Sequence, residues 1–182
     1  MTTGIPASLG GALAIAAVST LGDFLWVTWE LQNRPLNGIL HGSLLFLCIG
    51  LYLGVLAKKH LTGAISGALI GGLAAGGFYL IAPVLGRSAM FFLYFATWIA
   101  LGFLNQRLTQ REVPGTNIRA AFGRGVLAAV GSGVAFYLVS GIWFPFDPQG
   151  WDYLLHLGAW TVAYLPGFAA LLVTREVSRQ RG

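Results

Sequence analysis

Six long apolar runs, separated by short polar breaks, account for almost the whole of this 182-residue chain. A helix needs roughly 20 mostly apolar residues to cross the hydrocarbon of a bilayer. The runs are continuously hydrophobic and lack the alternation of a β-barrel strand. We predict an all-α integral membrane protein with six transmembrane helices in a single domain, residues 1–182. The predicted spans are residues 9–29, 36–57, 61–85, 88–106, 125–144 and 153–174.

The basic residues divide unequally between the two sides that these spans define. The side that carries the N-terminus holds nine of them: Lys58, Lys59, Arg107, Arg111, Arg119, Arg124, Arg175, Arg179 and Arg181. The other side holds Arg34 and Arg87. Short loops rich in Lys and Arg stay in the cytoplasm, so both termini are expected to be cytoplasmic.

Composition excludes several classes of protein. Hydrophobic residues make up 56% of the chain and charged residues 9%, and no stretch is left over for a soluble domain. The net charge is +5, but the basic residues flank the spans and form no patch with interleaved aromatics, which argues against a nucleic-acid partner. The uncharged first 22 residues lack the basic start of a signal peptide. High Ala, Gly and Arg usage indicates a bacterial chain and a plasma-membrane location.

Small residues recur in the third span at spacings that allow close helix contact. The positions predicted to pack against another helix are Gly67, Gly71, Gly72 and Gly76. We expect this span to be the central helix. Similar Gly/Ala-rich starts in the first, third and fifth spans also raise the possibility of a repeated two-helix hairpin.

Few ionisable residues lie at membrane depth. Asp23 is inside the first span, and His41, Asp152 and His156 lie toward the same side in other spans. Such groups are costly in lipid unless paired or wetted, which favours a polar pocket or a clamp between helices, for example from Asp23 to His41. No metal-ligand spacing or nucleophile motif accompanies them, so we expect no metal, no cofactor and no enzymatic activity.

Aromatic residues near the same side favour a lipid cavity inside the bundle. The predicted lining consists of Phe78, Tyr79, Phe136, Tyr137 and Trp143, with Gly141 beside them. Asp23 and Asp152 are predicted at the mouth, where a carboxylate can accept a hydrogen bond from a lipid hydroxyl.

The second half of the chain resembles the INSIG (insulin-induced gene) family. The resembling segments are Phe122-Gly123-Arg124-Gly125-Val126 before the fifth span, Gly141-Ile142-Trp143 at its end, and Asp152-Tyr153-Leu154 ahead of Trp160. The resemblance implies six helices with cytoplasmic termini and a non-enzymatic bundle that holds a lipid. By matching motif, the resemblance implies a role in lipid binding for Asp152, Gly141 and residues 122–126. It makes Asp152 the preferred acceptor for the lipid hydroxyl.

The leading interpretation is therefore a bacterial membrane protein that binds a neutral lipid, diacylglycerol or a sterol-like molecule, and acts in regulation or assembly. Two alternatives stay open. The chain is an accessory subunit bound to another membrane protein or to a second copy of itself, or it is a small transporter, for which polar groups near the membrane midplane are scarce.

Overall fold

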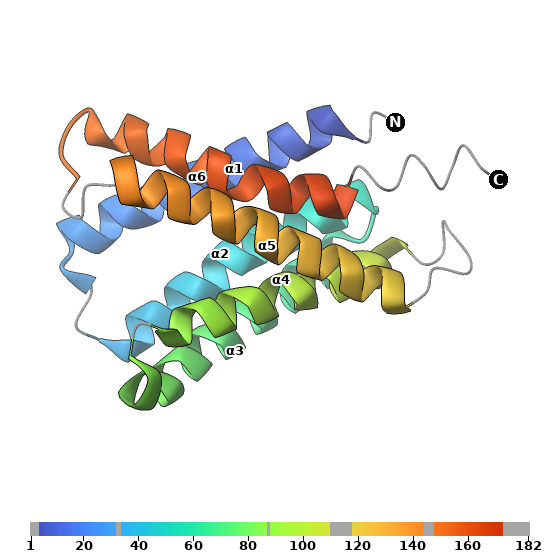
Figure 1. Cartoon of the computed structure of the whole chain (residues 1–182), viewed down its shortest axis with the longest axis horizontal. Coiled ribbons are helices and arrows are strands. Elements are labelled where there is room, and N and C mark those ends of the chain that lie inside the picture. Colours follow the sequence, from blue (N-terminus) through green and yellow to red (C-terminus); the bar gives the residue numbers. More distant parts are fainter. Residues whose placement is uncertain (1–3, 32–33, 87, 110–117, 144–147, 173–182) are drawn as a thin grey trace.

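The computed structural model describes residues 4–31, 34–86, 88–109, 118–143 and 148–172, and only the backbone of residues 140–143. Within these residues the chain is all-helical and contains no strand. The helices, shown in Figure 1, are α1 (Ile5–Thr28), α2 (Pro35–Leu56), α3 (His60–Leu85), α4 (Ser88–Thr109), α5 (Ile118–Trp143) and α6 (Asp152–Leu172). Each is long and apolar enough to cross a membrane, so the chain is a multi-pass membrane protein.

The helices exceed the predicted spans at several ends, most clearly at the start of α5. Helix α5 starts at residue 118 instead of 125, and α4 continues to residue 109 instead of 106. The additional turns carry Arg107, Arg119 and Arg124. Hydropathy locates the apolar stretch, but a helix continues into the interface as long as its backbone bonds are satisfied. The predicted ends at residues 144 and 174 lie outside the described residues.

The six helices pack as a ring (Figure 1). Helix α1 packs on α6, α6 on α5, α5 on α4, α4 on α3, and α3 on α2. Helices α1 and α2 touch only sparsely, although they are consecutive in the chain. The two-helix hairpins therefore pack unequally, and the ring has a loose seam between α1 and α2.

Helices α2 and α3 form the closest pair because glycines face each other along them. An added Cβ at Gly67 or Gly71 would meet the α2 backbone at Phe46, Gly50 or Gly42. Gly72 is opposite only the side chain of Ser43, and an added Cβ at Gly76 would have nothing within 4 Å. The predicted packing face therefore ends before Gly76.

Helix α3 is not the central helix, and that prediction was wrong. Its buried residues are all glycines, namely Gly63, Gly67 and Gly71. Its large side chains point outward, among them Leu61, Ile65, Leu69, Leu73, Leu80 and Val84. Helix α3 thus packs against α2 through its backbone and exposes its large side chains to the surroundings. Close small-residue spacing marks tight contact with one neighbour, and it does not place a helix at the centre.

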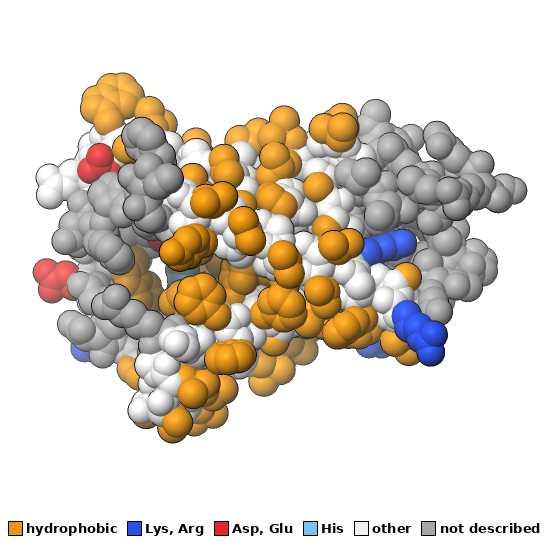
Figure 2. All heavy atoms as spheres, in the orientation of Figure 1, with side chains coloured by type: hydrophobic (Ala, Val, Ile, Leu, Met, Phe, Trp, Pro, Cys, Tyr) orange, Lys and Arg blue, Asp and Glu red, His pale blue; other side chains and the backbone are white. Residues whose placement is uncertain are grey.

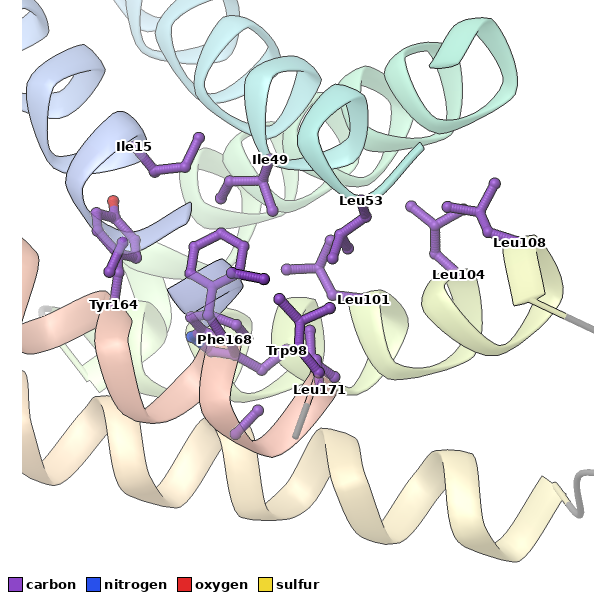
Figure 3. Packing of buried hydrophobic residues seen from close by; sticks show 14 of the residues in the cluster. Ile15, Ile49, Leu53, Trp98, Leu101, Leu104, Leu108, Tyr164, Phe168 and Leu171 are labelled. Atoms are coloured by element: carbon purple, nitrogen blue, oxygen red, sulfur yellow. The ribbon is translucent and has the colours of Figure 1, made fainter. Parts of the chain in front are cut away.

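The apolar core lies in the half of the bundle where α1 begins and α6 ends. Ile15 of α1, Ile49 and Leu53 of α2, and Phe168 of α6 point toward one another there. Trp98 and Leu101 of α4 close the group from below in the view of Figure 3. These side chains are almost wholly buried, and together they tie α1, α2, α4 and α6 into one packed unit.

The other half of the bundle is open. The buried residues of α2 begin at Ile49, and those of α5 end at Ser132, so residues 35–48 of α2 and 133–139 of α5 contribute none. The helices also spread apart toward this end in Figure 1. We call this region the open half; it comprises residues 20–28, 35–44, 76–85, 88–95, 133–139 and 152–160.

Candidate functional site

A carboxylate at membrane depth organises the α1 side of the open half. Oδ2 of Asp23 lies 2.8 Å from Nδ1 of His156 and accepts a hydrogen bond of 2.7 Å from Nε1 of Trp160. An ionised carboxylate only accepts hydrogen bonds, so when Asp23 is ionised, Nδ1 of His156 carries the hydrogen. His156 is 2% exposed. Two N–H donors from α6 thus hold one oxygen of Asp23.

Helical spacing explains why these groups meet. His156, Trp160 and Tyr164 follow one another at four-residue intervals on one face of α6. Ser19 and Asp23 have the same spacing on α1, and the Ser19 hydroxyl lies 2.9 Å from the Tyr164 hydroxyl. The result is a two-step polar ladder between antiparallel helices, with the charged step in the open half and the neutral step nearer the core.

An aromatic stack fixes the orientation of the Trp160 indole. The ring of Phe136, from α5, stacks on Trp160 with centroids 5.3 Å apart, and Trp160 stacks on Tyr164 at 5.6 Å. Stacked rings have little freedom to rotate, so the Trp160 N–H is held toward Asp23.

The second oxygen of Asp23 is left for another group. Both protein bonds use Oδ2, and Oδ1 accepts none from the residues that the structure describes. The Asp23 side chain keeps 23% of its surface exposed. A carboxylate that is clamped at one oxygen and accessible at the other can accept a further hydrogen bond.

His41 of α2 reaches the same region across the loose seam. Its ring packs against Gly22, where an added Cβ would collide with it, and makes an edge contact with Trp26 at a centroid distance of 5.6 Å. The predicted clamp from Asp23 to His41 is therefore replaced by one to His156, and His41 stands beside it.

Asp152 has a local role. It begins α6, and its Oδ2 accepts a 3.0 Å hydrogen bond from the backbone N–H of Gln149. A carboxylate in the first turn of a helix also opposes the positive end of the helix dipole. Asp152 therefore stabilises the start of α6, one turn before His156.

The predicted aromatic lining is divided between separate places. Phe78 and Tyr79 contact each other on α3, and Tyr79 packs over Gly38 of α2. Phe136 belongs to the stack on α6, whereas Tyr137 is 70% exposed. Among the described residues, no Cα atom of α3 lies within 8 Å of a Cα atom of α5. At Gly141 and Trp143 the structure describes the backbone alone.

The surface of the open half is hollowed. Figure 2 shows an opening between apolar side chains at this end, with a histidine visible inside it. A shallow groove of about 370 Å³ runs along α1 and α6, lined by Ala17, Thr20, Leu21, Phe24, Tyr153, Leu154 and Leu157. This groove faces outward and is nearly all apolar, so an ordinary bilayer acyl chain would suit it.

The described residues contain no group of three His, Cys, Asp or Glu side chains that could hold a metal ion. The hydrogen bond from Trp160 to Asp23 was not predicted from the sequence. The matching four-residue spacings on α1 and α6 are the signal that could have found it.

Comparisons with protein-family models, with curated proteins and with solved structures found no match. Function must therefore be argued from the site itself.

Proposed function

We propose that this protein binds a neutral lipid with a free hydroxyl group, such as a diacylglycerol or a sterol-like lipid, in the open half of the bundle. The hydroxyl donates a hydrogen bond to Oδ1 of Asp23, and the apolar body of the lipid lies between the spread helices. The protein acts through regulation or assembly, without catalysing a reaction.

One observation carries this proposal, namely the half-satisfied carboxylate of Asp23. A charged group within a membrane span costs several kcal/mol unless it is paired, and such groups usually serve a function. His156 and Trp160 satisfy Oδ2 only. A neutral amide would serve equally well as a simple clamp between α1 and α6. A charge with one accessible oxygen is explained better by a ligand that donates a hydrogen bond.

Two further arguments support the proposal. The second half of the chain resembles INSIG proteins, which implies a lipid held among six helices. The excess of basic residues on one side favours cytoplasmic termini, and residue usage favours a bacterial plasma membrane. In that orientation the open half belongs to the outer leaflet.

The test is native mass spectrometry of protein purified in mild detergent. The wild type is expected to retain one hydroxylated lipid per chain, and Asp23→Asn should retain much less. Losing a charge-assisted hydrogen bond costs about 1.5–3 kcal/mol, or about ten- to a hundredfold in affinity.

Asp152→Asn is the matched control because it changes a second carboxylate in the same way, at the start of α6. It should retain lipid like the wild type. Equal lipid retention by Asp23→Asn and the wild type, or a requirement for Asp152 alone, would contradict the proposal.

A further inference from the structure

We infer that His41 is the second polar ligand of this site, and that Asp23 and His41 together select lipids by their free hydroxyl group. The inference rests on the proposed function and deepens it, since it names the lipid group that the site recognises. Asp23 takes the hydroxyl hydrogen, and a ring nitrogen of His41 donates to the hydroxyl oxygen.

The surroundings of His41 leave the hydrogen-bonding capacity of its ring nitrogens unused within the described residues. The ring is half-buried within a membrane span. Neither ring nitrogen makes a hydrogen bond to any residue in the described ranges. The ring contacts the Gly22 backbone and packs edge-on against Trp26, and neither contact is a hydrogen bond to a ring nitrogen. A polar ring in an apolar layer without hydrogen bonds is costly, and a ligand oxygen would remove that cost.

Asp23 and His41 offer complementary hydrogen-bonding groups. Oδ1 of Asp23 can only accept, whereas a neutral imidazole has one N–H that donates. A hydroxyl is the smallest lipid group that donates one hydrogen bond and accepts another. An ester, an ether or a hydrocarbon cannot donate to Asp23, and an ammonium group cannot accept from His41. The pair therefore favours an alcohol over these other lipid groups.

The position of the pair also gives the ligand a structural effect. Asp23 is fixed to α6 through His156 and Trp160, whereas His41 belongs to α2. Helices α1 and α2 touch sparsely, so a hydroxyl bound to both residues would link them across the loose seam. Glycine at position 22 leaves room for the His41 ring, because any side chain there would collide with the ring.

The experiment compares two lipids that differ by one group. Purified full-length protein in detergent is titrated with 1,2-dioctanoylglycerol and with its deoxy analogue, propane-1,2-diol dioctanoate, and the ratio of the two dissociation constants is measured. Both lipids have the same acyl chains, so general effects of a variant on the bundle cancel in the ratio. The wild type should prefer the alcohol by at least about tenfold.

The variant His41→Phe keeps a ring against Trp26 but removes both nitrogens. It should lower the preference for the alcohol about two- to tenfold and leave binding of the deoxy analogue unchanged, because only a hydrogen bond to a neutral group is lost. His41→Gln, which restores a donor, should recover the preference. His41→Leu replaces His41→Phe if the larger ring prevents folding.

Two results would overturn the inference. If His41→Phe keeps the wild-type ratio of dissociation constants while Asp23→Asn removes the preference for the alcohol, His41 does not recognise the hydroxyl. The proposed function would then still stand. If neither lipid binds to the wild type, the proposed function fails, and the inference fails with it.

Discussion

Replacing Gly67 by Ala should separate the α2–α3 pair. An added Cβ at this position would lie 3.0 Å from the Cα of Gly50 and closer still to the carbonyl oxygen of Phe46. Both atoms belong to the α2 backbone, so no side-chain rotation can relieve the overlap, and the helices must move apart. Overpacking of this kind typically costs about 1–3 kcal/mol.

Gly76→Ala is the matched control, since it makes the same substitution in the same helix where an added Cβ meets nothing within 4 Å. Replacing Gly by Ala inside a helix stabilises it by about 0.5–1 kcal/mol. This gain is common to both variants, so the difference between them isolates the packing cost at Gly67. Gly72→Ala should fall between them, because the facing Ser43 hydroxyl can rotate away.

The assay is reversible unfolding in mixed micelles of dodecyl maltoside and SDS. We expect Gly76→Ala to be as stable as the wild type or slightly more stable, and Gly67→Ala to unfold with a free energy about 1–3 kcal/mol below that of Gly76→Ala. Equal free energies of unfolding for the two variants would show that the glycine contact does not determine how closely α2 and α3 pack.

Two other predictions concern topology and the packed half. In a Cys48→Ser background, an impermeant thiol reagent should label Gln149→Cys in intact cells and leave Lys58→Cys unlabelled until the cells are opened; the reverse pattern would invert the topology. Asn105 donates a buried 2.9 Å hydrogen bond to the carbonyl of Leu171. Asn105→Ala should therefore lower the free energy of unfolding by about 1–3 kcal/mol, and an unchanged value would show that this link between α4 and α6 is not needed.

Sequence alone predicted the six helices because a span is a local property of about 20 residues. It could not predict the order of the ring, since every run is apolar and any pair of spans can pack. The error about α3 has this origin: its glycines indicate contact, but their partner on α2 is chosen by shape.

The same limit applies to the site. Asp23 stood out because a charge in an apolar run is conspicuous, and His41 was the nearest candidate partner in sequence. The actual partner, His156, is 133 residues away, and it meets Asp23 because α1 and α6 pack side by side. Asp152 was favoured by the family resemblance, whereas its hydrogen bond is to the backbone of Gln149.

The most direct test of the central claim, that the lipid head lies inside the open half, is photo-crosslinking. A diacylglycerol with a diazirine close to its free hydroxyl is added to the purified protein, irradiated, and mapped by mass spectrometry. The account predicts labels on α1 and α2 around Asp23, Trp26 and His41, suppressed by excess unlabelled dioctanoylglycerol. Labels confined to the outer groove at Leu21 and Leu154, or labels that excess lipid does not suppress, would contradict it.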